Sequence, residues 1–241
     1  MSLAAKLVLS PLLVAQAVRT RARAPVLPEA AGPRDGVIGA GPACRVLMVG
    51  DSSAAGVGVA TQDLALAGHL TRTLAHAARV QVHWRLIARS GINSAQALAL
   101  VQAEATGGAD FAVVVLGVND VVDQVPSQRA VQRRAALADW LLAERGVGHV
   151  VFAPLPPMHQ FPLLPQPLRW ILGSDARRHN TAMAQWAATR SDVSHVPIDI
   201  RLGADTMAAD GFHPGEPVYR TCGEALAHFI AAKLNSHKEP T

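Results

Sequence analysis

Aromatic residues are scarce in this chain of 241 amino acids, where Phe, Trp and Tyr together make up 4% of the sequence. Half of the residues are nevertheless hydrophobic, so Ala, Val and Leu must fill the core. A chain of this length suits one α/β domain, and length alone requires no second one.

Cysteine is also scarce. Cys44 and Cys222 are the only two in the sequence, and their spacing fits neither a metal site nor a disulfide framework. We expect both to be small buried residues, and a single bridge between them is the alternative that the sequence leaves open. We expect no metal and no cofactor.

No hydrophobic run near the N-terminus is long enough to span a bilayer, since residues 7–14 are interrupted by Ser10 and Pro11. Residues 15–17 fit the small-residue pattern of a signal-peptide cleavage site. An arginine cluster at 19–23 follows directly, and positive charge there favours retention on the cytoplasmic side. We therefore expect a short amphipathic lead-in on a cytoplasmic or peripherally membrane-associated protein. Export through a short signal peptide is the alternative.

The positive charge is concentrated in this lead-in. Residues 1–36 contain five basic and two acidic side chains, a balance of +3 out of +4 for the whole chain, which leaves +1 for the rest. Such an arm attracts anionic lipid head groups or, non-specifically, nucleic acid. We predict an anionic membrane surface and no nucleic acid as its partner, and a solvated lead-in is an equally good interpretation. The sequence indicates no oligomeric state.

Apolar segments alternate with helical patterns in the rest of the chain. We predict strands at 45–49, 80–88, 111–116, 149–155 and 194–198. We predict helices at 61–79, 93–105, 127–145, 174–190 and 218–234. Asn93 and Ser127 are the expected N-caps of two of these helices. Residues 25–43, which are rich in Pro, Gly and Ala, are predicted to be a linker, so the chain divides into a lead-in (1–43) and one domain (44–241).

This alternation predicts βαβ units with right-handed crossovers. The expected fold is α/β, a doubly wound and mostly parallel five-stranded sheet with helices on both faces. In such a sheet, ligands bind beyond the carboxyl ends of the strands. The residues directly after each strand are therefore where we expect chemistry.

Polar and glycine-rich segments follow the strands at this edge. Gly50-Asp51-Ser52 ends the first predicted strand, Gly91 follows the second, and Gly117-Val118-Asn119-Asp120 follows the third. A late loop supplies Asp210-Gly211-Phe212-His213. Serine is a poor nucleophile unless a base lies within hydrogen-bond reach and a third group orients that base. The sequence offers all three parts in Ser52, His213 and Asp210.

These motifs resemble the sequence blocks of the GDSL, or SGNH, hydrolases, in the right order over residues 44–234. Gly50-Asp51-Ser52 with Gly56 is similar to block I, and Gly91 is similar to the glycine of block II. Gly117-Val118-Asn119-Asp120 matches block III, G-x-N-D, and Asp210-Gly211-Phe212-His213 matches block V, D-x-x-H. Ser53 departs from the usual Leu of block I, which puts only local packing in doubt.

The resemblance implies a flavodoxin-like SGNH fold and a serine esterase or lipase without a metal. Ser52 would attack an ester carbonyl, His213 would take its proton and Asp210 would hold His213 in the correct tautomer. The backbone N–H groups of Ser52 and Gly91 and the side-chain amide of Asn119 would form the oxyanion hole. Glycine lets the backbone approach the substrate, and an amide NH₂ donates without a proton that could be lost.

Other interpretations of the same residues are weaker. No Gly-Lys-Ser/Thr follows the glycines at 56 and 58, which argues against a phosphate loop. Ala54 stands where the G-x-S-x-G elbow needs glycine. A second D-x-x-H, Asp192-Val193-Ser194-His195, lies at the start of the fifth predicted strand, on the opposite edge. We expect His195 to be structural or exposed, and Asp51 and Asp120 to brace loops.

The apolar, proline-rich loop 155–172 follows the fourth predicted strand. Apolar walls with a few polar groups are typical of ligand pockets, so we predict that the acyl side of the site is walled by Met158, His159, Phe161 and Leu164. A rigid cover over the core is the alternative.

We expect a lipid-like or short-to-medium acyl ester or thioester as substrate. The alternatives are a carbohydrate O-acetyl ester, against which the scarce aromatics argue because sugar sites often use stacking rings, and a non-catalytic binding module on the same scaffold.

Overall fold

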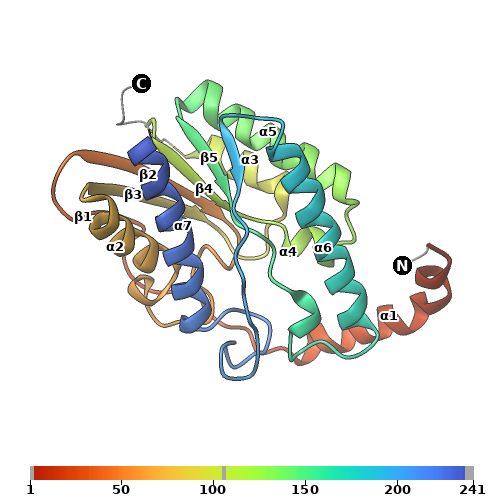
Figure 1. The fold of residues 1–241 in the computed structure, drawn as a ribbon. Helices are drawn as coiled ribbons and strands as arrows, with labels where there is room; N and C mark the ends of the chain where they lie inside the picture. Colours follow the sequence, from red (N-terminus) through yellow and green to blue (C-terminus); the bar gives the residue numbers. More distant parts are fainter. Residues whose placement is uncertain (1–2, 105–106, 237–241) are drawn as a thin grey trace.

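A six-stranded sheet forms the centre of the protein, with strand order β1-β3-β2-β4-β5-β6 (Figure 1). The computed structural model describes residues 3–104 and 107–236, with side chains from residue 9 onward. Strand β1 runs antiparallel to β3, and the other neighbours are parallel. The strands are β1 (Asp35–Ile38), β2 (Ala43–Gly50), β3 (Gln81–Ala88), β4 (Phe111–Val115), β5 (His149–Phe152) and β6 (Val193–His195).

Helices cover both faces of this sheet. The α-helices are α1 (Leu3–Arg23), α2 (Leu66–Ala78), α3 (Ser94–Ala103), α4 (Val118–Val122), α5 (Ser127–Arg145), α6 (Leu168–Ala187) and α7 (Glu216–Ser236). Two short 3-10 helices are η1 (Gln62–Leu64) and η2 (Met158–Gln160). Helices α2 and α7 pack on one face, and α3, α5 and the end of α6 pack on the other. Every residue of β5 is buried, as expected for a parallel strand covered on both sides.

The predicted doubly wound, mostly parallel sheet is therefore confirmed, but the strand count of five is wrong. The additional strand β1 lies within the predicted linker, and its four residues pair with Arg85 to Val82 of β3. Its exposure alternates along the strand, because it is an edge strand with one solvated face. The linker prediction is thus wrong for residues 35–38. The division into a lead-in and one catalytic domain stays a prediction.

Helix ends follow the predicted capping chemistry in one case and not in another. Asn93 caps α3 by accepting the Ala95 N–H at 3.1 Å, and the side chain of Gln96 accepts the Asn93 N–H at 3.0 Å. Residue 105, the predicted end of this helix, lies outside the described residues. Ser127 is not an N-cap: it is the first residue of α5, and Pro126 precedes the helix without a side-chain bond. No disulfide joins Cys44 to Cys222 in the described structure.

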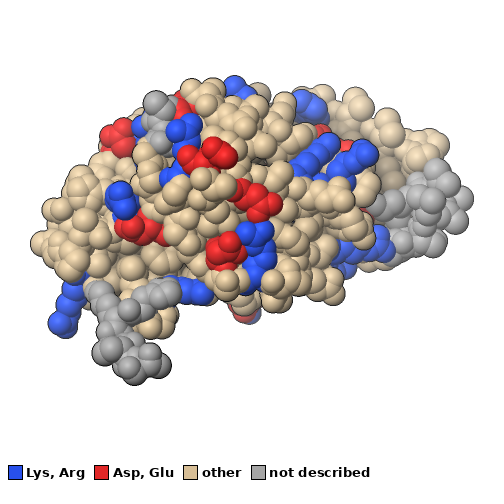
Figure 2. Space-filling view, turned by 90° about the horizontal axis from the view of Figure 1, so that it is seen from above, with Lys and Arg blue, Asp and Glu red and all other residues tan. Residues whose placement is uncertain are grey.

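A third apolar cluster lies at the carboxyl edge of the sheet, outside the two main face-packed cores. It includes Leu155, Met158 and Phe161 of the proline-rich loop and the first turns of α6. Helix α6 begins at Leu168, six residues before the predicted start at 174. Figure 2 shows a face of the body on which basic and acidic side chains are interspersed, so this face carries no field of a single sign.

Candidate active site

Ser52 follows directly from the carboxyl end of β2. Only glycine fits at the end of this strand. A Cβ on Gly50 would lie 2.4 Å from the Val115 carbonyl oxygen and 2.5 Å from the Ala54 side chain. Asp51 donates its N–H to the Val115 carbonyl at 3.2 Å, and the Ser52 carbonyl accepts the Val57 N–H at 3.0 Å. The main chain on both sides of the serine is thus held by hydrogen bonds.

The loop before α7 brings His213 to this serine. His213 Nε2 lies 3.0 Å from Ser52 Oγ, and His213 Nδ1 lies 2.6 Å from Asp210 Oδ2. The ring can therefore donate Nδ1–H to the carboxylate while Nε2 accepts the serine proton. The structure places Ser52, His213 and Asp210 in one hydrogen-bonded line although 161 positions of sequence separate the serine from the histidine.

Asp210 is built to stay ionised. Its side chain is buried, which raises the pKa, but hydrogen bonds from the His213 ring and from the backbone N–H groups of His213 and Phe212 outweigh burial and lower the pKa below its ordinary value. Both backbone bonds are 2.9 Å long and reach the same oxygen, Oδ1. This turn holds the second oxygen, Oδ2, toward the imidazole.

Three candidate hydrogen-bond donors follow the carboxyl ends of the adjacent strands β2, β3 and β4. Gly50 of β2 is in register with Ala88 of β3 and with Val115 of β4, so the segments after these strands emerge side by side. Within the described part of the chain, the backbone N–H groups of Ser52 and Gly91 donate to no protein acceptor. Gly91 has φ +80°, and a Cβ there would meet nothing within 4 Å, so the space beside its α-carbon is open.

Asn119, in the first turn of α4, supplies the third donor. Its Nδ2 donates one proton to the Ile92 carbonyl at 2.7 Å, which leaves the second proton of the amide for a ligand. The bond also ties Asn119 to the loop that carries Gly91. Preorganised donors of this kind stabilise the negative charge that develops on a carbonyl oxygen under nucleophilic attack.

The two aspartates beside these motifs are buried and do not reach the triad. Asp51 Oδ1 accepts the Ser53 N–H at 3.0 Å, and burial raises the pKa of Asp51 to about 6. Asp120 accepts the N–H and the hydroxyl of Ser94. Arg134 of α5, fully buried, lies 4.0 Å from Asp120. These contacts match the predicted bracing of loops.

Sequence reasoning missed Arg134, because an arginine beside Arg133 in a long helix is usually solvated. The Arg134 guanidinium also donates to His179 Nδ1 at 3.3 Å, and His179 Nε2 donates to the Val125 carbonyl at 3.0 Å. This buried chain of polar groups joins α4, α5 and α6. No pattern in the sequence identifies it.

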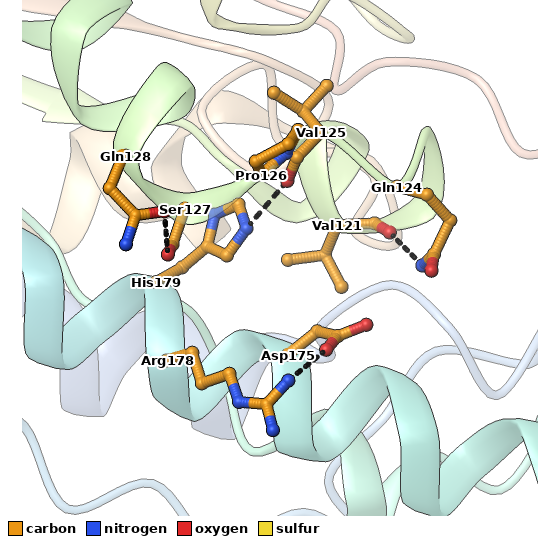
Figure 3. A pocket seen from close by; sticks show the side chains of 9 residues that line it. All are labelled: Val121, Gln124, Val125, Pro126, Ser127, Gln128, Asp175, Arg178 and His179. Atoms are coloured by element: carbon orange, nitrogen blue, oxygen red, sulfur yellow. Dashed lines mark hydrogen bonds and ion pairs between the residues drawn. The ribbon is translucent and has the colours of Figure 1, made fainter. Parts of the chain in front are cut away.

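The structure contains a pocket of about 380 Å³ between α4, the start of α5 and α6 (Figure 3). It is lined by Val121, Gln124, Val125, Pro126, Ser127, Gln128, Asp175, Arg178 and His179. Asp175 and Arg178 form an ion pair of 3.4 Å on its α6 side. The lining includes neither the triad nor the oxyanion donors, so this pocket lies apart from the serine. A smaller cavity of about 60 Å³, mostly apolar, lies against Asp51 and Ser53.

The four predicted acyl-pocket residues line neither of these two spaces. Met158, Phe161 and Leu164 are buried in the third apolar cluster, and His159 is exposed with Nδ1 3.5 Å from Arg177. Phe161 packs edge-on against Phe212, with ring centroids 5.1 Å apart, and Phe212 contacts the His213 ring. The loop therefore packs against the His213 ring through Phe212.

Among residues 3–104 and 107–236, no three His, Cys, Asp or Glu side chains lie close enough together to hold a metal ion.

Comparisons with known proteins identify related sequences and folds. The model of the GDSL-like Lipase/Acylhydrolase family matches residues 48–221. A search of curated proteins finds no match.

Three of the similar solved structures match about four-fifths of this chain and nearly all of their own length. The lipase Lip_vut3 from a goat rumen metagenome is 16% identical, with a TM-score of 0.62 over 78% of this chain and 97% of that one. A lipase/acylhydrolase from Enterococcus faecalis is 18% identical, with a TM-score of 0.55 over 79% and 96%. Est24, a carbohydrate acetylesterase from Sinorhizobium meliloti, is 16% identical, with a TM-score of 0.57 over 79% and 99%. At these identities the similarity establishes a shared fold.

Proposed function

We propose that this chain, which belongs to the GDSL-like lipase/acylhydrolase family and is a carboxylic ester hydrolase, acts through an acyl-enzyme on Ser52. The observation that carries the proposal is the hydrogen-bonded line from Ser52 Oγ to His213, 3.0 Å, and from His213 to Asp210, 2.6 Å. These distances are those expected of a serine activated by an oriented imidazole.

The reaction proceeds in two halves. Ser52 Oγ attacks the ester carbonyl carbon while His213 Nε2 takes the hydroxyl proton, and the imidazolium then gives that proton to the leaving alcohol as the C–O bond breaks. Water enters next, His213 removes a proton from it, and the water oxygen attacks the acyl carbonyl carbon; as the bond to Ser52 Oγ breaks, the imidazolium returns the proton to Oγ and the carboxylic acid leaves. Asp210 remains ionised throughout and stabilises the imidazolium at each step. The N–H groups of Ser52 and Gly91 and the Asn119 amide receive the oxyanion.

For the substrate we favour a lipid-like or short-to-medium acyl ester or thioester. The apolar surroundings of the histidine support this choice. Phe212 lies against the His213 ring, Phe161 packs against Phe212, and Leu164 belongs to the same apolar cluster as Phe161. We keep the 155–172 loop as a proposed wall of the acyl side, which would act through Phe212, the residue whose ring contacts both Phe161 and His213. A carbohydrate O-acetyl ester is the second candidate, because Est24, which shares the fold, is a carbohydrate acetylesterase.

A fluorophosphonate probe followed by mass spectrometry tests the nucleophile. We expect the label on Ser52 and none on Ser52→Ala, because the probe needs an activated serine. p-Nitrophenyl esters of graded chain length, together with an acetylated sugar, then separate the two substrate classes. An unlabelled but folded protein would favour a non-catalytic binding module on the same scaffold.

We also propose that α1 rests on an anionic membrane surface. Leu9, Leu13, Gln16 and Thr20 are its partly buried residues, and they recur at helical spacing on the side that faces the body. Leu13 packs against the third apolar cluster, and Gln16 donates to the Gln166 carbonyl at 2.7 Å and accepts the Leu168 N–H at 3.2 Å. The helix is thus docked against the loop that supports His213.

The opposite side of α1 is exposed to solvent and carries apolar side chains. Val14 is 62% and Val18 65% exposed, and Pro11 and Ala22 share this side. Arg19 and two further exposed arginines, Arg21 and Arg23, flank it, and the helix contains no acidic residue. In the described residues no helix has the length and apolarity to cross a bilayer. An apolar strip flanked by arginines is the composition of a helix that lies in the interface plane.

Liposome sedimentation tests this contact. Vesicles containing phosphatidylglycerol should bind the protein, and binding should fall steeply with salt because exposed charges are screened. Replacing Arg19, Arg21 and Arg23 by Gln should abolish most binding. Replacing Arg79, Arg129 and Arg201, which are exposed on the body, makes the same change in charge and should leave binding intact. Equal loss in both triple variants, or binding to neutral vesicles that ignores salt, would contradict the proposal.

A further inference from the structure

A carboxylate from outside the matched family region holds the loop that carries Gly91. Glu29 Oε1 accepts two hydrogen bonds from Ser90, one from its backbone N–H and one from its hydroxyl, each 2.7 Å long. From residue 90 to residue 92, Ser90 has the only backbone N–H that donates to a protein acceptor in the described structure. Glu29 therefore anchors this loop directly before the proposed oxyanion donor, and the Asn119 bond to the Ile92 carbonyl anchors it directly after.

Arg34 fixes the carboxylate in turn. Its Nη2 pairs with Glu29 Oε2, and its Nη1 donates to the Ala88 carbonyl at 2.7 Å, at the end of β3. The Arg34 carbonyl accepts the Leu86 N–H at 2.7 Å. Each oxygen of Glu29 thus has a partner of its own, and the pair is attached to the strand that leads into the loop.

The segment that contains Glu29 and Arg34 also contacts the turn that follows Ser52. Ala30 donates its N–H to the Ala55 carbonyl at 3.2 Å, and the Gln62 side chain donates to the carbonyls of both Ala30 and Ala55. A Cβ on Gly56 would lie 2.7 Å from the Ala30 side chain, so the two segments are in close contact. Residues 29–34 therefore contact both segments that supply backbone donors to the proposed oxyanion hole. These are the loop that carries Gly91 and the turn that follows Ser52.

We propose that Glu29, held by Arg34, is a positioning residue that sets the N–H of Gly91 relative to the N–H of Ser52. The inference rests on the proposed function, since it concerns the donors that receive the oxyanion. Donors contribute to catalysis only when they are aimed before the charge develops, and a displacement of a fraction of an ångström weakens them. A Cβ on Gly91 would meet nothing within 4 Å, so no side-chain packing positions this residue, and the hydrogen bonds of its two neighbours hold the loop.

The experiment measures kcat, KM and the affinity of an alkyl trifluoromethyl ketone in Glu29→Ala. This ketone adds to Ser52 Oγ with transfer of the serine proton to His213, and its carbonyl oxygen becomes an oxyanion. We expect kcat to fall at least about tenfold, and by no more than the roughly 10²–10³-fold loss that follows when a donor is removed outright. Inhibitor affinity should fall by the same factor while KM changes little, because the donors act on the oxyanion and not on the bound ester.

The matched control is Glu104→Ala, which removes a carboxylate paired with Arg85 of the same strand at 3.1 Å. Ser90→Ala, which keeps the backbone bond, should lie between the control and Glu29→Ala. Thermal unfolding identifies any variant that loses activity by losing its fold, and Arg34→Gln provides a second disruption of the same pair. Activity of Glu29→Ala equal to that of Glu104→Ala, or a loss confined to KM with inhibitor affinity intact, would overturn the inference. Activity remaining in Ser52→Ala would instead overturn the proposed function itself, and this inference with it.

Discussion

Two segments of this chain share the pattern D-x-x-H, and the structure treats them in opposite ways. In Asp210–His213 the carboxylate and the ring are 2.6 Å apart. In Asp192–His195 the carboxylate pairs with Arg190 through two bonds of 2.8 Å, and His195 lies at the end of β6. His195 Nε2 is buried with no partner in the described residues.

The difference comes from the backbone between the two residues. Asp210 accepts the N–H groups of the second and third residues after it, which curls the chain so that the imidazole returns to the carboxylate. Val193 to His195 are extended, and three steps of strand carry a side chain about 10 Å along the chain. A spacing of three therefore indicates a catalytic couple only when a turn intervenes.

The largest effect expected from this comparison concerns the two histidines. His213→Ala should reduce kcat by about 10⁴–10⁶-fold, because without the base the serine keeps its proton and members of a triad act as a unit. His195→Ala should leave kcat within about twofold of the unmodified protein, since residues outside the reacting unit do not contribute to its transition state. Steady-state hydrolysis of one p-nitrophenyl ester measures both. Comparable losses in the two variants would refute the assignment of the base.

A smaller effect is expected for the two aspartates. Asp210→Asn should lower kcat by about 10²–10⁴-fold, because the amide can present the wrong hydrogen-bond partner to Nδ1 and leaves the imidazolium without a counter-charge. Asp192→Asn breaks only the bond to Arg190 and should not change kcat. The pre-steady-state burst of p-nitrophenol measures the acylation step separately, and we expect the loss in Asp210→Asn to lie in that step. If Asp210→Asn retained full activity, orientation of His213 would have to come from another group.

The smallest effect is in stability and involves the second segment alone. Burial lowers the pKa of His195 to about 4, with the Arg134 charge adding to it. Between about pH 6.5 and 4 the unfolded chain binds a proton at this residue and the folded chain does not, so stability falls as the pH falls through this window. His195→Asn should therefore gain stability relative to the unmodified protein as urea unfolding is moved from pH 7 to pH 4.5.

Asp192→Asn is the control for this pH series. Hydrogen bonds from Arg190 lower the pKa of Asp192, so its contribution is lost only below the ordinary aspartate pKa and should be constant over the same window. A difference curve for His195→Asn that is as flat as the one for Asp192→Asn would show that His195 is not the source of acid sensitivity.

Much of the fold was predictable because its signals are local. The apolar run of β4, the cap at Asn93 and the stop at Gly146, whose φ of +59° suits glycine, are properties of neighbouring residues. Strand β1 was not predictable, since four residues with alternating exposure, between glycine-rich segments, carry little periodicity. The early start of α6 was hidden by the prolines of the preceding loop.

The residues of the candidate site differ in the same way, since some have a local signal in the sequence and others do not. The glycine, asparagine and serine motifs follow strand ends, and the parallel sheet requires those ends to meet at one edge. Glu29, Arg34 and Arg134 have no such signal, because nothing adjacent in the sequence distinguishes a charged residue that will be paired from one that will be solvated. Their partners, Ser90 and Asp120, come from distant segments.

The sequence by itself determined the alternation of strands and helices from β2 onward, the basic character of the N-terminal arm and the residue types at each strand end. These follow from hydrophobic period, charge count and turn chemistry, all of which act over a few residues. Only the tertiary structure decided which aspartate meets which histidine and which carboxylate anchors the Gly91 loop. Both depend on how distant segments approach after the sheet and helices have packed, and a hydrogen bond of 2.6 to 3.0 Å exists only once that packing is complete.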